Sequence, residues 1–523
     1  MKNQTLSLVL FPFVIMATGC NKKKTPPPNI LILMSDNQSW NHLGCYGDPV
    51  VRTPNIDKVA AQGLHFTHAF CAAPSCAPAR AGMLTGQDIW RLEEGANLWG
   101  ILPVKFEVYP EKLEKAGYIT GFNGKGWGPG SYEASGRTRN PGGTAYKSFE
   151  EFIGAATIDK SWCFWYSSTD PHRPFAGSNT ASYFFATSST DNLGSFSLGS
   201  GSGKASGMNI DNVFVPPYLP DNDTVRSDIC DYYSEIERFD REVGHILEKL
   251  TESGQSDNTI IIICSDNGWQ MPCGLANLYD AGTRVPLIIS WKGKITEGRV
   301  VEDFVNLNDL APTFLELAGL EIPEYMTASS LTNILFSEKS GRIEKSRDHI
   351  ITARERHAFC RRNGLGYPCR AIRTYDFLYI RNYEPDRWPA GDPPLFGDID
   401  AHMLHYPSPT KVNMMINKDK PEVKPLYDHA FMKRPPEELY DLQKDPWQLN
   451  NIADNSDYQN IKSGLSKKLN DYLETTRDPR ILGKQIIWDK AEYFITEDFK
   501  PKPCEEAVKL LNLKPEYNYL EDK

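Results

Sequence analysis

The stretch Asn29-Ile-Leu-Ile-Leu-Met34, followed by Ser35-Asp36-Asn37, decides the fold class of this chain. It is a continuous apolar run that ends in polar residues, which is typical of a buried parallel strand that stops at the edge of a sheet. The same pattern recurs at Thr259-Ile-Ile-Ile-Ile-Cys264, which runs into Ser265-Asp266-Asn267-Gly268. Two such strands predict an α/β fold built on a central, mostly parallel sheet.

Two further runs have the same character. Tyr118-Ile-Thr-Gly-Phe122 leads into Gly124-Lys125, and Ser161-Trp-Cys-Phe-Trp-Tyr166 leads into Asp170-Pro171-His172. Open α/β sheets bind their ligands beyond the carboxyl ends of the strands. We therefore expect the polar residues after these four strands to meet in one site.

Helical patterns separate the strands. The clearest runs from about Asp223 to Leu250, where apolar residues recur at three- and four-residue steps and predict a buried structural helix. A weaker one covers Asn308 to Ala318. Between Ser188 and Gly207, twelve of twenty residues are Ser or Gly, which predicts a flexible surface insertion.

The amino-acid composition changes after about residue 345, where Pro-rich loops and Arg clusters become frequent. We expect a smaller C-terminal α+β subdomain there, with strand-like runs at Ala371–Thr374 and Phe377–Ile380 and an amphipathic helix near Asp457–Thr475. The predicted boundaries are 29–345 for the catalytic domain, 346–485 for the subdomain and 486–523 for a C-terminal extension.

Composition excludes several classes of protein. The chain has 523 residues, 24% of them charged, and a formal net charge of −10. This balance is ordinary for a globular protein, so the chain as a whole is neither disordered, collagen-like nor a polytopic membrane protein. Nucleic acid is not expected as a partner, because phosphate contacts need a surplus of positive charge.

The N-terminus has the pattern of a targeting signal. Lys2 precedes the apolar stretch Leu6 to Ala17, which ends in Thr18-Gly19-Cys20. The stretch is too short for a membrane-spanning helix but suits a signal peptide over residues 1–20. Small residues before a cysteine resemble a bacterial lipoprotein cleavage site. We expect Cys20 to be lipidated, residues 21–28 to form a tether, and the protein to lie in the periplasm or cell envelope with only its lipid anchor in the membrane. A plain secretory signal is the alternative.

The stretch from Cys71 to Gly86 carries a family signature. Cys76-x-Pro78-x-Arg80, continued by Met83-Leu84-Thr85-Gly86, resembles the motif of type I, formylglycine-dependent sulfatases. The resemblance extends over roughly residues 29–480 and implies an alkaline-phosphatase-like fold. The alternative for Cys76 is a buried structural thiol.

The resemblance implies roles for individual residues. In the family a maturation enzyme oxidises the cysteine to formylglycine (3-oxoalanine), whose hydrated aldehyde attacks sulfur, so Cys76 would supply the nucleophile. Arg80 would orient it, Lys125 would contact the sulfate group and His172 would protonate the leaving group. Pro78 fits the first turn of a helix, where a missing backbone donor costs little, and the helix N-terminus favours an anionic group.

A metal ion is implied as well. Asp36, Asn37, Asp266 and Asn267 are oxygen donors at two strand ends, which suits a hard cation such as Ca²⁺, with Mg²⁺ as the other candidate. Family analogy places modified Cys76 at the same ion. The alternative for these residues is a turn-forming role after strands. His65-x-x-His68 lacks two further ligands at suitable spacing and is expected to be structural.

Three positions depart from the family pattern. Asn37 stands where the family usually has Asp, which removes one negative charge from the metal site. Trp127 replaces a histidine that would hydrogen-bond the nucleophile. Leu275 occupies the place of a sulfate-binding Lys or Arg four residues before Tyr279.

The substrate predicted by the resemblance is a sulfated saccharide, carrying O- or N-sulfate. Asp170-Pro-His-Arg173 and the stretch Val215 to Asp228 are most similar to the sulfamidase (heparan N-sulfatase) branch. We expect Trp127 and the cluster Arg354-Glu355-Arg356-His357, with Arg361 and Arg362 nearby, to line the pocket. A solvated charge run is the alternative for this cluster.

Two other functions stay open at this stage. Relatives on the alkaline-phosphatase-like fold cleave phosphate esters, so a phosphoester hydrolase is one alternative. A catalytically impaired, glycan-binding lipoprotein is the other, which the three departures favour and the intact nucleophile motif opposes.

Overall fold

The computed structural model describes residues 27–156, 160–173, 175, 208–398, 408–494, 509 and 512. The predicted signal peptide with Cys20, the Ser/Gly-rich insertion at 188–207 and most of the C-terminal extension lie outside the described residues. Among those described, none of the helices combines the length and the hydropathy needed to span a bilayer.

A mostly parallel sheet forms the centre of the larger domain, as predicted. Every neighbouring pair in it is parallel except the two that β8 makes. In spatial order its strands are β5 (Thr144–Ala145), β4 (Ile119–Gly124), β6 (Trp162–Ser167), β1 (Asn29–Ser35), β7 (Thr259–Ser265), β8 (Leu287–Ser290), β2 (Leu64–Phe66) and β9 (Arg299–Val301).

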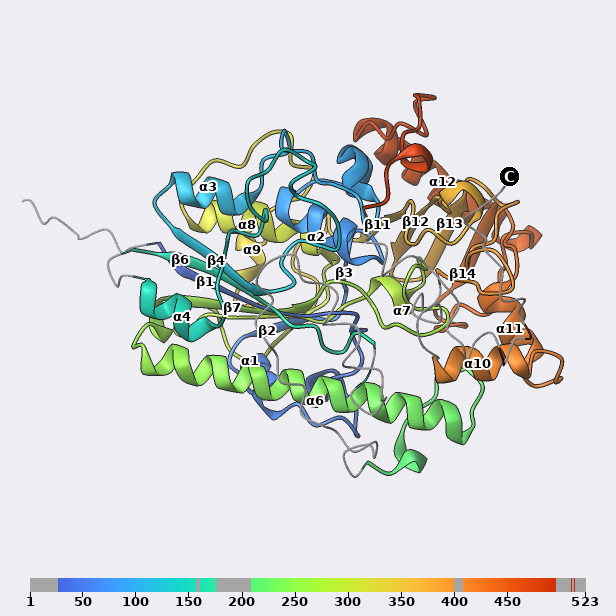
Figure 1. Cartoon of the computed structure of the whole chain (residues 1–523), viewed down its shortest axis with the longest axis horizontal. Helices are drawn as coiled ribbons and strands as arrows, with labels where there is room; N and C mark the ends of the chain where they lie inside the picture. The colour runs from blue at the N-terminus through green and yellow to red at the C-terminus, as the bar shows by residue number, and fades with distance from the viewer. Residues whose placement is uncertain are drawn as a thin grey trace, which may run out of the picture.

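Helices cover both faces of this sheet (Figure 1). One face carries α1 (Pro54–Ala61), α4 (Phe149–Ala155) and the long α6 (Asp223–Glu252); the other carries α2 (Cys76–Thr85), α3 (Tyr109–Lys115) and α8 (Leu310–Leu317). Strand β1 contributes side chains to both faces of the sheet. Leu31 and Leu33 pack in the core under α6, whereas Ile30 and Ile32 pack in the core under α2 and α8. Burial on both faces explains the unbroken apolar run.

Helix α6 confirms the predicted apolar stripe. Asn222 caps its start, because the side-chain oxygen accepts from the backbone N–H groups of Thr224 and Val225 at 3.1 and 3.2 Å. The whole predicted stripe is buried: Ile229, Tyr232, Ile236, Phe239, Val243, Ile246 and Leu250. The helix ends two residues later than predicted, at Glu252. The weaker pattern begins as a 3₁₀ turn, η6 (Leu307–Asp309), and continues as α8.

The smaller unit is an antiparallel sheet flanked by helices, as predicted, and lies beside the larger domain (Figure 1). Its strands are β11 (His349–Arg354), β12 (Cys369–Thr374), β13 (Phe377–Asn382) and β14 (Glu437–Asp441), and its helices are α10 (Pro409–Ile416), α11 (Lys424–Phe431) and α12 (Gln459–Thr475). Shorter elements are the strand pair β3 (Ala69–Phe70) and β10 (Val305–Asn306), and the helices α7 (Asp280–Thr283) and α9 (Thr332–Leu335).

The two units are joined by hydrogen bonds between buried groups. The backbone N–H of Ala353 in β11 donates to the carbonyl of Ala72, 3.0 Å away, just upstream of α2. The hydroxyl of Tyr472 in α12 donates to Oδ2 of Asp88 at 3.0 Å. Burial raises the pKa of Asp88 from 3.8 to about 6.

This buried carboxyl predicts a pH-dependent stability. Because its folded-state pKa lies above the unfolded value, its stabilising contribution is complete below pH 3.8 and is lost as the pH rises through about 6. Asp88→Asn keeps an acceptor for Tyr472 without the charge. We expect its melting temperature to exceed that of the wild type by more at pH 8 than at pH 5. An equal difference at both pH values in calorimetric scans would show that Asp88 is not the group that titrates.

Candidate active site

The carboxyl ends of β1, β4, β6 and β7 meet at one edge of the sheet, as expected. Ser35 pairs with Ser265 in the parallel register, which places Asp36 beside Asp266. The N–H of Asp36 donates to the carbonyl of Asp170 at 2.8 Å, and the N–H of Lys125 donates to that of Ser167 at 3.3 Å. Four segments far apart in the sequence therefore supply one site.

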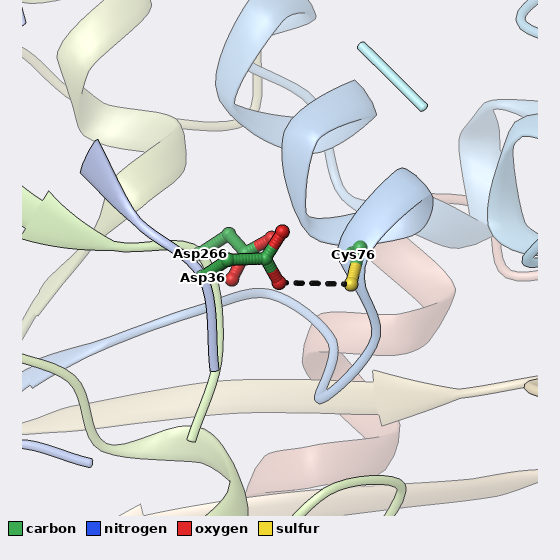
Figure 2. A group of neighbouring side chains, drawn as sticks. All are labelled: Asp36, Cys76 and Asp266. Atoms are coloured by element: carbon green, nitrogen blue, oxygen red, sulfur yellow. Dashed lines mark hydrogen bonds between the residues drawn. The ribbon is translucent and has the colours of Figure 1, made fainter. Parts of the chain in front are cut away.

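Cys76 points at this edge from the first residue of α2 (Figure 2). Its Sγ lies 3.5 Å from Oδ1 of Asp36, 3.8 Å from Oδ1 of Asn37 and 3.7 Å from Nδ2 of Asn267. Burial and the Asp36 carboxylate raise the pKa of the thiol, so the site does not favour a thiolate. The partly positive N-terminus of α2 favours a bound anion.

Arg80 lies one turn further along α2 and joins the two acidic strand ends. Its Nε donates to Oδ2 of Asp266 at 2.8 Å and its Nη2 to Oδ2 of Asp36 at 3.3 Å. Its Nη1 donates to the carbonyl of Gly126 and the hydroxyl of Ser167, at 2.6 and 2.5 Å. The guanidinium is fully buried. Arg80 therefore fixes the orientation of both carboxylates relative to the helix that carries Cys76.

Lys125 adds a second cation. Its Nζ lies 2.6 Å from Oδ2 of Asp36, and its side chain keeps 18% of its surface exposed. Gly124 before it has φ +83°, and a Cβ there would lie 2.0 Å from the carbonyl oxygen of Ser167. Only glycine fits this close approach of β4 to β6, which explains the Gly-Lys pair.

The two buried carboxylates differ in electrostatic environment. Burial opposes the charge of Asp36, but Lys125 and Arg80 outweigh it and lower the pKa of this carboxyl to about 2. For Asp266, burial and the neighbouring Asp36 carboxylate raise the pKa. Two carboxylates at such close range favour a shared cation.

The residues present fit a hard divalent cation. Ligand atoms of Asp36, Cys76 and Asp266 all lie within 4.8 Å of one another, the one such group among the described residues. Oδ1 of Asn267 is buried and has no hydrogen-bond partner in the described part of the chain, as expected for an atom that holds a ligand. Asn37 presents Oδ1 toward Cys76, because its Nδ2 donates to Oε1 of Gln270 at 3.1 Å. This donor set of carboxylate and amide oxygens suits Ca²⁺ or Mg²⁺.

The amide at position 37 gives a direct prediction. Asn37→Asp restores a negative charge without changing the shape of the side chain, and carboxylate ligands raise Ca²⁺ affinity. We expect the dissociation constant for Ca²⁺, measured by titration calorimetry, to fall by roughly tenfold. Asn258→Asp is the matched control, since it makes the same change just before β7, at the opposite end of the strand from Asp266. An unchanged dissociation constant in Asn37→Asp would place the cation elsewhere.

His172 lies beyond the end of β6, close enough for its pKa to respond to Asp36, Lys125 and Arg80. Burial lowers this pKa to about 4. Its Nδ1 donates to the carbonyl of Arg173, which leaves Nε2 as the acceptor of the neutral ring. Arg173 is in turn held by a bidentate ion pair with Asp228, at 2.8 and 2.6 Å. A bound sulfate group would favour the protonated ring.

Two of the departures from the family pattern, Trp127 and Leu275, are buried and uncharged. Trp127 is buried, and its Nε1 has no hydrogen-bond partner among the described residues. Leu275 is also buried, with its backbone N–H donating to the carbonyl of Trp269 at 2.8 Å. Neither side chain supplies a cation.

The cluster at residues 354–357 is buried and not a solvated charge run. Arg354 forms an ion pair with Asp398, and Glu355 pairs with Arg370 and Arg480 at 2.7 and 2.6 Å. Arg356 donates to the carbonyls at positions 491 and 492, at 2.8 and 3.0 Å. The charges of Arg354 and Glu355 are thus paired with opposite charges inside the fold, whereas the Arg356 guanidinium is held by backbone carbonyls. His357 differs, because its Nδ1 lies 2.8 Å from the hydroxyl of Ser75, next to Cys76.

Sequence reasoning missed several residues that position the site. Gln270 orients Asn37, and Ser75 contacts His357. Ser167 accepts a hydrogen bond from Arg80, and Asp228 accepts one from Arg173. Gln270 and Ser75 lie within a few residues of recognised motifs, and that proximity was the available signal. Asp228 lies on α6, where the apolar stripe gave no indication of its role.

Among the described residues, His65 and His68 have partners outside the site. His65 packs on Tyr46 with ring centroids 5.0 Å apart, and His68 hydrogen-bonds Thr67 at 2.9 Å. All nine cysteines in the described part of the chain are free thiols.

Comparison with known proteins agrees with this geometry. The sulfatase family profile matches residues 28–320, and the profile for the C-terminal region of N-sulphoglucosamine sulphohydrolase matches residues 276–389. An ulvan-active sulfatase of Formosa agariphila is 26% identical over 94% of this chain and 90% of its own length. Human N-sulphoglucosamine sulphohydrolase is 26% identical over 87% of this chain and 91% of its own length.

Solved structures show the same fold. A protein crystallised with its substrate D-glucosamine-2-N,6-O-disulfate superposes with a TM-score of 0.60 at 19% identity, covering 88% of this chain and all of its own. A 2-O GAG sulfatase gives the same TM-score at 18% identity, covering 91% of this chain and 99% of its own. The family match covers more than half of the chain and includes the strand ends, Cys76 and Arg80, so this protein belongs to the sulfatase family.

Proposed function

We propose that this protein hydrolyses sulfate esters or sulfamates of a sulfated saccharide, using formylglycine made from Cys76 and a Ca²⁺ ion held by Asp36, Asn37, Asp266 and Asn267. The observation that carries the proposal is the convergence of Cys76, two carboxylates, Arg80 and Lys125 within one buried site. An anionic sulfuryl group needs such cations close to the nucleophile.

The residues of the site have distinct roles in this reaction. The hydrated aldehyde would supply the attacking hydroxyl, and the cation would polarise the sulfate oxygens. Arg80 and Lys125 hold the acidic residues in place and offset the charge that develops on the sulfuryl group. His172 gives a proton from Nε2 to the departing oxygen or nitrogen, while the carbonyl of Arg173 holds its Nδ1–H.

Relatives support a saccharide as the substrate. The curated relatives named above act on ulvan and on N-sulphoglucosamine, and a structural neighbour binds a disulfated glucosamine. The match to the C-terminal region of N-sulphoglucosamine sulphohydrolase supports the sulfamidase-like branch for this chain. From the sequence of the N-terminus alone, we also propose that the protein lies in the bacterial envelope with Cys20 lipidated. Formylglycine at Cys76 makes the maturation enzyme a partner.

Sulfate release from defined sugars tests the proposal. The protein, made in a host with a formylglycine-generating enzyme, is incubated with N-sulfated and O-sulfated glucosamine and with nitrophenyl phosphate. We expect sulfate to appear from at least one sulfated sugar, measured by ion chromatography, and no phosphate. Faster phosphate release would favour a phosphoester hydrolase. Sugar binding without turnover, with Cys76 fully converted, would favour the glycan-binding alternative.

A further inference from the structure

Ser75 occupies the N-cap position of α2 but does not cap the helix. Its backbone is extended, with φ −163° and ψ 131°, and its side chain makes no bond to the first turn. An N-cap hydroxyl ordinarily accepts from the second or third amide of the helix. Here the third residue is Pro78, which has no N–H to give. Pro78 thus removes one of the two usual donors, and the hydroxyl of Ser75 does not take the other, the N–H of Ala77.

The partner of the Ser75 hydroxyl is His357 of the C-terminal subdomain. Oγ of Ser75 lies 2.8 Å from Nδ1 of His357, and both residues are only 3% exposed. They are 282 residues apart in the chain. This side-chain contact therefore ties the residue directly before the nucleophile to the smaller unit.

The backbone around His357 is held on three sides. The N–H of Ala353 donates to the carbonyl of Ala72 at 3.0 Å, and the N–H of Arg356 donates to Oδ1 of Asn97 at 3.1 Å. The N–H of Ala358 donates to Oδ1 of the buried Asp398 at 2.8 Å. These hydrogen bonds fix the backbone that carries the His357 imidazole, and so fix the position from which it contacts Ser75.

We propose that His357 is a positioning residue: through Ser75 it fixes the start of α2, and with it the reacting atoms of residue 76. Catalysis then depends on docking of the C-terminal subdomain. Because the Ser75 hydroxyl is engaged by His357, it does not compete for the first amides of α2, which stay available to an anion. The kinetic part of this inference rests on the proposed sulfatase function.

A double-mutant cycle tests the contact. We expect Ser75→Ala and His357→Ala each to lower kcat by roughly 10- to 100-fold, with KM changed less than about threefold, because a displaced nucleophile slows the reaction without weakening binding. The double variant should be no slower than the slower single variant, since both remove the same contact. Multiplying effects, or a loss expressed mainly in KM, would overturn the proposal.

Two replacements separate positioning from substrate contact. His357→Asn places its amide where Nδ1 lies and should retain most of the activity. His357→Gln places its amide nearer the position of Nε2 and should behave like His357→Ala. The reverse order would make His357 a substrate contact and refute the positioning role.

A measurement without turnover distinguishes this inference from the proposed function. In protein from a host without the maturation enzyme, iodoacetamide alkylation of the Cys76 thiol is followed by peptide mass spectrometry. Ser75→Ala and His357→Ala should speed alkylation by a similar factor, roughly tenfold, because the start of α2 opens more often, and His357→Asn should not. Unchanged rates in the alanine variants would refute the positioning role. An inactive wild type would contradict only the sulfatase proposal.

Discussion

Replacing Cys76 with alanine is expected to lower sulfate release by roughly 10⁴-fold or more, because loss of a covalent nucleophile leaves only binding and electrostatic stabilisation. Its Sγ lies 3.5 Å from Oδ1 of Asp36 and 3.8 Å from Oδ1 of Asn37. The change removes a single sulfur atom from the buried start of α2, so the fold should persist. Steady-state sulfate release and circular dichroism measure the two effects.

Cys71→Ala is the matched control. Cys71 is also buried and lies five residues upstream, but its Sγ contacts the carbonyl of Gly282 at 3.9 Å and not the acidic residues. We expect this variant to keep near wild-type activity. Mass spectrometry of the wild-type peptide should show the CH₂SH group of residue 76 replaced by CHO. Comparable activity in wild type and Cys76→Ala would refute the mechanism.

Asp266→Asn should have the next largest effect. The amide keeps the shape of the side chain and can still accept from the backbone of Asn37, but it removes one of two carboxylates at the cation and weakens the pairing with Arg80. We expect Ca²⁺ affinity to fall by roughly 100-fold or more and kcat/KM by roughly 10³-fold. Calorimetric titration with Ca²⁺ and saccharide turnover at saturating Ca²⁺ measure the two effects separately.

Asp257→Asn is the control for this change. Asp257 precedes the opposite end of the same strand, β7, and its side chain is 81% exposed. It should leave both Ca²⁺ affinity and turnover unchanged. If Asp266→Asn kept wild-type affinity for Ca²⁺, the ends of β1 and β7 would not be the metal site. The main role of Asp266 would then be its ion pair with Arg80.

Much of the fold was predictable because it rests on local patterns. The unbroken apolar run of β1 follows from burial on both faces of a parallel sheet, and the three- and four-residue steps of α6 follow from one buried stripe. The start of α6 at Asp223 matches the prediction, but the helix runs two residues beyond Leu250, and the second helix begins as a 3₁₀ turn that periodicity does not register.

The residues of the candidate site likewise include some that could be predicted from the sequence and some that could not. Asp36, Lys125 and Asp266 were predictable because each follows a strand. Cys76 and Arg80 were predictable because both lie in the Cys76-x-Pro78-x-Arg80 motif. Arg354, Glu355 and Arg356 were not, because their environments depend on distant partners such as Asp398 and Arg370. A charged residue in a sequence gives no indication whether its partner is substrate, solvent or another buried charge.

The sheet, its helical layers and the edge at which polar residues gather follow from the amino-acid sequence alone, because strand and helix periodicities are encoded over a few residues. Which side chains those polar residues meet depends on the tertiary structure. Asn37 takes its orientation from Gln270, and Ser75 meets a histidine 282 residues away. The first pairing depends on how two loops of the larger domain pack at the sheet edge, and the second on how the two units dock. Both geometries are fixed by packing across the whole chain and not by any local pattern.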